Sequence, residues 1–172
     1  MIPFAKIVAL CIAAAISYGV VHDQFTIRIC LEYFTIGHPP IFAELPATLH
    51  AAAWGVFATW WVGLFLGVLA GAASRLGTWP KHSAADLRRP IASMLVAMAI
   101  GSILAGMFGY TLSSHGIVTL REPLALRVPF DKHDRFVACT AAHLAAYAIA
   151  ALGGLFNCGR VIYLRRKSAK AS

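Results

Sequence analysis

Four long apolar runs alternate with shorter polar segments along the chain. They cover about residues 2–21, 48–73, 91–112 and 136–164. A helix that crosses the hydrocarbon core of a bilayer, about 30 Å thick, needs about 20 apolar residues. The pattern therefore predicts an all-α membrane protein, a four-helix bundle that forms one integral membrane domain over residues 1–172.

The segments between the runs predict a smaller second feature. Within the loop 22–47, polar and apolar residues alternate strictly from 24 to 33. Alternation with a period of two is typical of a half-buried strand, and a lone strand needs a partner. We therefore expect a small β element over the end of the bundle, with its partners in the other outer loop, 113–135, at 117–121 and 124–128.

Arg28 and Glu32 are candidates for an ion pair inside this polar segment. On a strand they share one face, and on a helix they lie one turn apart. The helix would scatter the apolar residues around its axis, so the strand is favoured. We expect Arg28 to pair with Glu32 or Asp23.

Composition points to lipid as the solvent of this chain. Apolar residues make up 59% of the sequence and charged residues 13%, and the mean hydropathy is +0.72. Soluble domains contain about half apolar and a quarter charged residues. A net charge of +8 would suggest nucleic-acid binding if the basic residues shared one water-exposed face. The four spans divide them, so no nucleic-acid partner is expected.

The charges are divided unequally between the two sides of the predicted bundle. The side with the termini, the loop 74–90 and the tail 165–172 carries ten basic residues and one acid, a net charge of +9. The other side carries five basic and six acidic residues, a net charge of −1. The positive-inside rule places the basic side, with both termini, in the cytoplasm. A cleaved signal peptide is the alternative interpretation of the first run.

Small residues recur at four-residue spacing inside the runs. Gly63, Gly67 and Gly71 share one helix face, and Gly154 ends a similar row in the fourth run. Lipid tails do not drive helices together, so close packing of small residues must do so. We expect these glycines to pack helices within one chain. A homo-oligomer face, or contact with another membrane protein, is the alternative.

Histidines and carboxylates gather on the predicted outer side. An ionisable group within a span, such as His143, is costly and tends to be functional. Imidazole and carboxylate groups bind transition metals, and a bundle brings its helix ends together. The alternative roles are hydrogen bonds from His22 and His50 to loop backbone, a partner for His143 across helices, and a proton relay or a substrate contact. A transition metal or a haem is thus a candidate cofactor, and the candidate ligands are His22, Asp23, Glu32, His50 and His143.

Four cysteines show no CxxC spacing, which excludes a zinc ribbon or a dithiol redox motif. Cys30 and Cys139 both fall near the outer side. A disulfide between them and two free thiols are the alternatives.

Two stretches resemble a known family. "YGVVHDQFTIRICLEYFTIGHP", residues 18–39, resembles a YGxxHDQxTxRxxxEYFTxxHP signature of small bacterial membrane proteins without an established activity. "RFVACTAAHLAAYAIAALGG", residues 135–154, is similar to their late HxxxY followed by paired glycines. The resemblance implies a bacterial inner-membrane protein. Its motif positions here are Tyr18, His22, Asp23, Gln24, Thr26, Arg28, Glu32, Tyr33, Phe34, Thr35, His38 and Pro39, with His143 and Tyr147 as the later pair.

The sequence favours a non-enzymatic accessory, sensing or assembly protein whose segment 18–39 binds a ligand or partner. One alternative is a small transporter or channel that uses His143, Tyr147 and the outer carboxylates. Another is a metal- or haem-dependent membrane enzyme that uses the outer histidines. The candidate ligand or partner residues are Tyr18, His22, Asp23, Gln24, Arg28, Glu32, His38, His143 and Tyr147.

Overall fold

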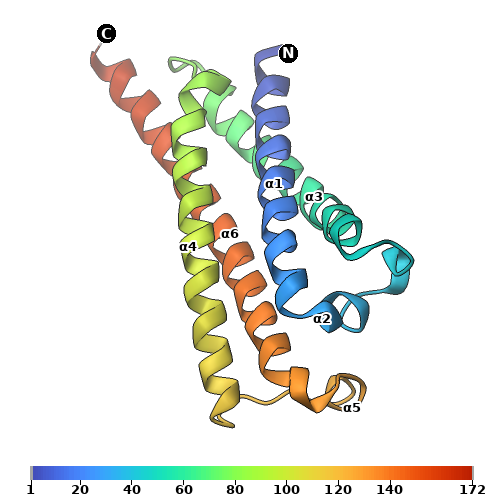
Figure 1. Cartoon of the computed structure of the whole chain (residues 1–172). Helices are drawn as coiled ribbons and strands as arrows, with labels where there is room; N and C mark the ends of the chain where they lie inside the picture. The colour runs from blue at the N-terminus through green and yellow to red at the C-terminus, as the bar shows by residue number, and fades with distance from the viewer. Residues whose placement is uncertain (1, 172) are drawn as a thin grey trace.

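The computed structural model describes residues 2–171 and is a bundle of four long helices (Figure 1). The long helices are α1 (Ile2–Ile29), α3 (Ala47–Arg75), α4 (Ala84–Ser114) and α6 (His133–Ala171). The connections contain α2 (Leu31–Thr35), α5 (Leu124–Arg127) and 3-10 turns at Pro40–Phe42 and Phe130–Lys132. All four long helices are long and apolar enough to cross a membrane, as a multi-pass membrane protein requires. The predicted all-α four-helix bundle is confirmed.

The predicted β element is wrong, because the described residues form no strand. Residues 24–29 continue α1, and 124–127 form α5. The buried side chains of this part of α1 follow helical spacing, at Asp23, Thr26 and Ile27. Phe25 and Ile29, which the strand would have buried, are 69% and 47% exposed. An exposed apolar side chain costs little beside lipid, so alternation does not report a half-buried strand there.

Several boundaries differ from the prediction for the same reason. The predicted outer loop 22–47 loses residues 22–29 to α1, and the predicted tail 165–172 belongs to α6 as far as Ala171. Hydropathy marks where polar residues begin in the sequence, whereas the helical backbone hydrogen bonds continue past that point. Of the polar candidate residues, His22, Asp23, Gln24 and Arg28 therefore lie on α1, and His38 lies in the connection after α2.

The helix ends carry ordinary stop and start signals. Gly77 and Gly116 follow the ends of α3 and α4 with φ of 78° and 71°, a left-handed backbone that glycine adopts without strain. At the start of α4, Ser83 and Asp86 form a capping box. α1 ends where Cys30 turns extended, with φ −150° and ψ 100°.

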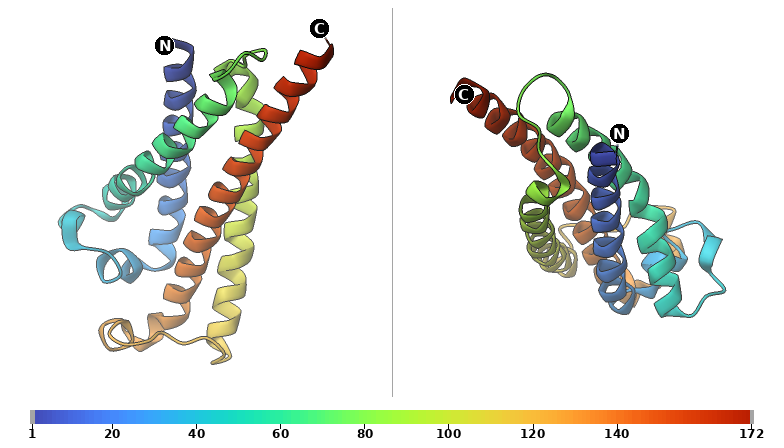
Figure 2. Two further views of the ribbon diagram at one scale, coloured as in Figure 1. Left: turned by 180° about the vertical axis from the view of Figure 1, so that it is seen from behind. Right: turned by 90° about the horizontal axis from the view of Figure 1, so that it is seen from above.

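The four helices form two closely packed pairs, α1 with α3 and α4 with α6 (Figure 2). Gly63, Gly67 and Gly71 face α1, and a Cβ added at Gly63 would lie 2.7 Å from the Ile12 Cα. A Cβ added at Gly154 on α6 would meet Leu66 of α3 at 2.9 Å. The glycine row is thus used in packing within the chain, so it is not available to a second copy.

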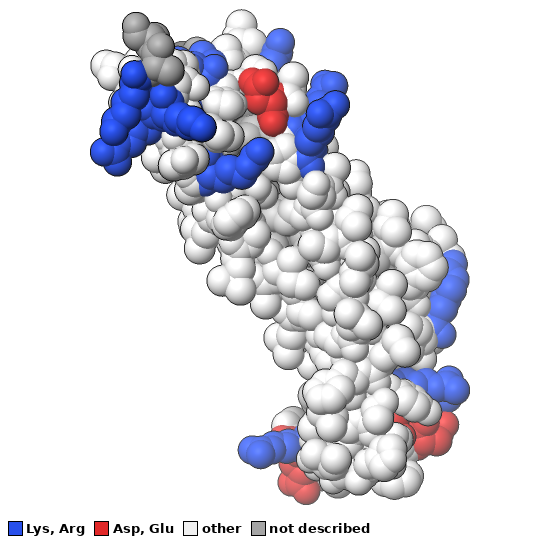
Figure 3. All heavy atoms as spheres, turned by 90° about the vertical axis from the view of Figure 1, so that its left-hand side faces the viewer, with Lys and Arg blue, Asp and Glu red and all other residues white. Residues whose placement is uncertain are grey.

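Both chain ends and the connection between α3 and α4 lie at one end of the bundle (Figure 1). Lysine and arginine side chains predominate over acidic ones at the end with the C-terminus, whereas the opposite end carries the two signs of charge in similar measure (Figure 3). One of these cations is buried: Arg165 on α6 is 2% exposed. Its guanidinium donates to the carbonyls of Pro80 at 2.7 Å, Leu76 at 2.7 Å, Trp79 at 3.2 Å and Ala73. Arg165 therefore fastens α6 to the end of α3.

Candidate functional site

A narrow cavity of about 140 Å³ lies between the two helix pairs. Its polar end is lined by His22 and Asp23 from α1, His143 from α6, and His38 from the segment after α2. Among the described residues that line it, Asp23 is the only carboxylate and there is no lysine or arginine. The sequence candidates Tyr18 and Tyr147 line the same cavity, so six of the nine predicted ligand or partner residues meet there.

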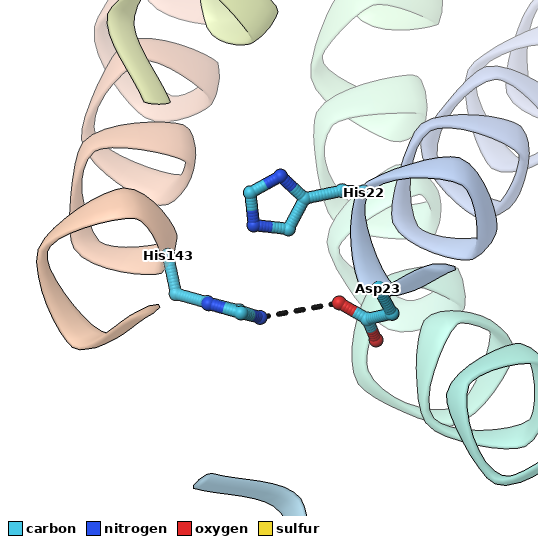
Figure 4. Close-up of side chains that lie close together, drawn as sticks. All are labelled: His22, Asp23 and His143. Carbon is cyan, nitrogen blue, oxygen red and sulfur yellow. Dashed lines mark hydrogen bonds and ion pairs between the residues drawn. The ribbon is translucent and has the colours of Figure 1, made fainter. Parts of the chain in front are cut away.

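His143 and Asp23 make the central contact of the polar end (Figure 4). The Nε2 atom of His143 lies 3.1 Å from Oδ1 of Asp23, and its Nδ1 atom lies 2.8 Å from the Cys139 carbonyl oxygen. A carbonyl oxygen only accepts, so Nδ1 carries a proton and donates it. In a neutral ring Nε2 is then a second acceptor that faces a carboxylate. Two acceptors repel, so this contact requires either a further proton or a cation between them.

His22 adds a third candidate ligand atom beside the His143 nitrogen and the Asp23 oxygen. Its Nε2 atom is buried and has no hydrogen-bond partner in the described structure. The ring stacks on Tyr18, with centroids 5.5 Å apart, and its centroid lies 4.5 Å from that of His143. A buried ring nitrogen without a partner costs about 1–3 kcal/mol. A ligand that bonds to the Nε2 atom of His22 would therefore remove this cost.

The three side chains have the composition of a transition-metal site. Their ligand atoms all lie within 4.8 Å of one another. Two ligand atoms on a tetrahedral zinc ion lie about 3.3 Å apart, given bonds of about 2.0–2.1 Å. The 3.1 Å between His143 and Asp23 already fits this spacing. The remaining distances, each no longer than 4.8 Å, would have to shorten by up to about 1.5 Å. The Cys139 carbonyl supplies the outer hydrogen bond that ligating histidines commonly make.

Helix α2 covers the polar end of the cavity. The Phe34 side chain is 1% exposed, and the Tyr33 ring lies 4.6 Å from that of His143. His38 Nδ1 lies 2.8 Å from the Tyr33 carbonyl, and its ring lies 4.7 Å from that of Trp54. Burial lowers the pKa of His38 and raises that of Tyr33. The side chains that cover the cavity are therefore mainly aromatic.

Two tyrosines join the helix pairs beside the site. The Tyr18 hydroxyl of α1 lies 3.0 Å from Ser102 Oγ of α4. The Tyr147 hydroxyl of α6 donates to the Ala58 carbonyl of α3 at 3.3 Å. Each bond crosses from one pair to the other, so together they fix the width of the cavity near its polar end.

Gln24 and Arg28 do not reach the cavity. Gln24 Nε2 donates to the Thr48 carbonyl at 2.8 Å, and Arg28 donates to Gln24 Oε1 at 2.9 Å and to Thr48 Oγ1 at 3.2 Å. The predicted ion pair of Arg28 with Glu32 or Asp23 is wrong: among the described residues Arg28 forms hydrogen bonds and no ion pair. These residues join the end of α1 to the start of α3.

Glu32 and His50 also stay outside the cluster. Glu32 accepts a hydrogen bond from the Cys30 thiol at 3.5 Å. His50 Nε2 accepts from the Trp54 indole at 3.0 Å, which occupies that nitrogen. Cys30 and Cys139 lie in one buried cluster as free thiols, and burial raises the pKa of Cys30 to about 11.

The sequence did not predict three further residues in or beside the cavity as part of the site. Trp54 lines the cavity, Ser102 holds Tyr18, and the Cys139 carbonyl orients His143. Cys139 and His143 are four residues apart on one helix, so their contact was open to prediction. The position of Trp54 depends on how α3 packs against α1, which spacing along the chain does not reveal.

Comparison with known proteins found no matching family model, no similar curated protein and no similar solved structure.

Proposed function

We propose that this chain is a metal-binding protein of the bacterial inner membrane that holds one divalent transition-metal ion through His22, Asp23 and His143. The observation that carries the proposal is the opposition of the His143 Nε2 atom and the Asp23 carboxylate at 3.1 Å, beside the unpartnered nitrogen of His22. A cation between the His143 nitrogen and the Asp23 carboxylate would bond to both and remove their repulsion. The same cation would give the His22 nitrogen a partner. Two imidazoles and one carboxylate suit zinc and ferrous iron.

Three protein ligands leave coordination positions open, unlike a structural zinc site, which is closed by four. The proposed ion thus serves to bind a further molecule, which fits a sensing or accessory protein with a ligand site within 18–39. A bare ion is favoured over haem. Ligands on opposite faces of a haem iron are about 4 Å apart, whereas His143 and Asp23 approach to 3.1 Å from one side.

Transport of ions is less well supported. An ion path needs polar groups along its length. Away from the His–Asp end the cavity wall is mainly apolar, with Thr59 and Asn157 as widely separated polar residues. The wall therefore fits an apolar occupant better than a permeating ion.

The proposed orientation places both termini in the cytoplasm and the metal site toward the outer face of the membrane. Ten of the fifteen lysines and arginines belong to the end that holds the termini. This division supports the orientation through the positive-inside rule.

Elemental analysis of purified protein tests the metal site. After loading with Zn²⁺ or Fe²⁺ and dialysis, we expect about one ion per chain. His22→Ala, Asp23→Asn and His143→Ala should each weaken binding by at least the 10–100-fold typical of an outer-shell change, because each removes a direct ligand. Asp23→Asn keeps the shape of the side chain and so separates metal loss from misfolding.

The control is His115→Ala. His115 is exposed, lies after α4 and bonds to its own helix end, with Nδ1 2.8 Å from the Thr111 carbonyl. This variant should keep full metal content. A wild-type protein without metal, or an equal loss in His115→Ala, contradicts the proposal.

A further inference from the structure

The cavity extends far beyond the metal-binding residues. On α6 its lining runs from His143 to Val161, and on α1 from Asp23 to Cys11. Eighteen residues of helix rise about 27 Å at 1.5 Å per residue. This is close to the thickness of a hydrocarbon core, about 30 Å. The cavity lining is therefore long and follows the helices through most of the bundle.

Its wall is apolar and adaptable along this length. The lining below the polar end includes Leu66 from α3, Ile91, Met94 and Met98 from α4, and Ala14 from α1. Methionine is flexible and fills irregular apolar space. A volume of about 140 Å³ spread over this length leaves a narrow space, which favours a thin apolar occupant.

The side of the cavity between α1 and α4 is loosely packed. These two helices contact each other much less than each contacts its own partner. Ala14 of α1 and Leu95 of α4 both line the cavity and are only partly buried. An occupant can reach the cavity from the membrane by separating these two helices below the bond between Tyr18 and Ser102.

We propose that this cavity takes the hydrocarbon chain of a single-chain anionic lipid from the bilayer, with its oxygen head group on the metal at His22, Asp23 and His143. The inference rests on the proposed function, because the metal supplies the attraction for the head group. A divalent ion beside one carboxylate leaves a positive charge that an anionic oxygen neutralises. The long, narrow apolar wall then favours a single hydrocarbon chain over a lipid with two chains.

Photocrosslinking with a palmitate analogue that carries a diazirine in mid-chain tests this inference. The metal-loaded protein is placed in detergent-free nanodiscs of phosphatidylcholine, because a detergent would itself fill the cavity. Mass spectrometry should find adducts on cavity-lining residues such as Met94 and Met98. Excess palmitate should suppress these adducts at least ten-fold more strongly than methyl palmitate, which lacks the anionic oxygen.

Ala14→Phe and Ala13→Phe form a matched pair. Ala14 lines the cavity, whereas its neighbour Ala13 is exposed on the outside of α1. Ala14→Phe should lower the cavity adducts at least ten-fold and leave the metal content unchanged, and Ala13→Phe should alter neither. Undiminished cavity adducts in Ala14→Phe, or wild-type adducts on outward-facing residues alone, overturn the inference.

The two proposals fail in distinguishable ways. A protein that binds one metal ion but forms no cavity adduct refutes the lipid inference and leaves the metal site. A cavity adduct in a protein that binds no metal refutes the metal site and, with it, the head-group contact. Equal suppression by palmitate and methyl palmitate also refutes the head-group contact.

Discussion

Asp23 and Arg165 are the buried charged side chains among the described residues, and they lie toward opposite ends of the bundle. A buried charge is expensive unless its hydrogen bonds are complete. Arg165 meets this condition with four backbone carbonyls. Asp23 has a single partner, His143, which itself needs a proton or a cation to bind it. The complete set of hydrogen bonds around Arg165 is typical of a structural residue. The incomplete set around Asp23 is typical of a binding site.

Replacement of Arg165 by Gln should destabilise the protein by about 3 kcal/mol, because buried carbonyls lose donors and bonds from charged groups are the stronger ones. Arg166→Gln is the matched control. It removes the same charge from the next position, which is exposed, and should change stability by less than about 0.5 kcal/mol. Unfolding midpoints in a denaturing-detergent titration measure both, and equal midpoints would contradict the role given to Arg165.

The residues of the site were predicted better than their contacts. His143 stood out in the sequence because an ionisable group inside an apolar run needs a reason to be there. Its contact with Asp23 joins positions 120 apart and depends on how α1 and α6 pack. His50 and Glu32 had equally suitable chemistry, but they found partners on their own or neighbouring helix turns. Residue type and spacing do not distinguish these cases.

At the scale of helices, the pattern of apolar residues carries different information in lipid and in water. The length of an apolar run located all four spans, because the bilayer sets that length. Alternation misled at residues 24–33, because the outward side of α1 meets lipid and can be apolar. The small-residue spacing is less ambiguous, since it reflects the close approach of two backbones.

Gly63 tests that close approach. Gly63→Ala should destabilise the bundle by about 1–3 kcal/mol, because the new Cβ would lie 2.7 Å from the Ile12 Cα and 2.8 Å from the Cys11 carbonyl oxygen. The control is Gly159→Ala on α6, where a Cβ has no neighbour within 4 Å. This change should be neutral or stabilising by up to about 1 kcal/mol, because alanine favours helix. The same denaturing-detergent titration compares them, and a Gly63→Ala protein as stable as the wild type would refute the role of this packing.

At the scale of the whole molecule, the two helix pairs and the charge distribution define one axis. The basic end holds the termini (Figures 1 and 3). The His–Asp cluster lies toward the other end, because His22 and Asp23 are near the end of α1 and His143 is near the start of α6. In the proposed orientation, the metal and its ligand would be bound near the outer surface of the membrane. Sequence was sufficient for this axis because the division of charge between loops does not depend on packing.

Reporter fusions test the orientation. Green fluorescent protein fused after residue 172 should fluoresce, because it folds in the cytoplasm. Alkaline phosphatase fused after residue 120, in the loop between α4 and α5, should be active, because it needs the oxidising outer compartment. The reverse pair of results would invert the proposed orientation.

Asp23 and His143 are far apart in the sequence, so the ribosome makes them at different times. The ribosome adds about 5–20 residues per second, so the 120 residues between them take roughly 6–24 seconds to make. For that interval α1 carries a carboxylate whose only side-chain partner has not been made. The site is complete only when the last long helix joins the bundle. Metal binding would then stabilise the finished bundle and none of its shorter precursors, so occupancy would report that assembly had ended.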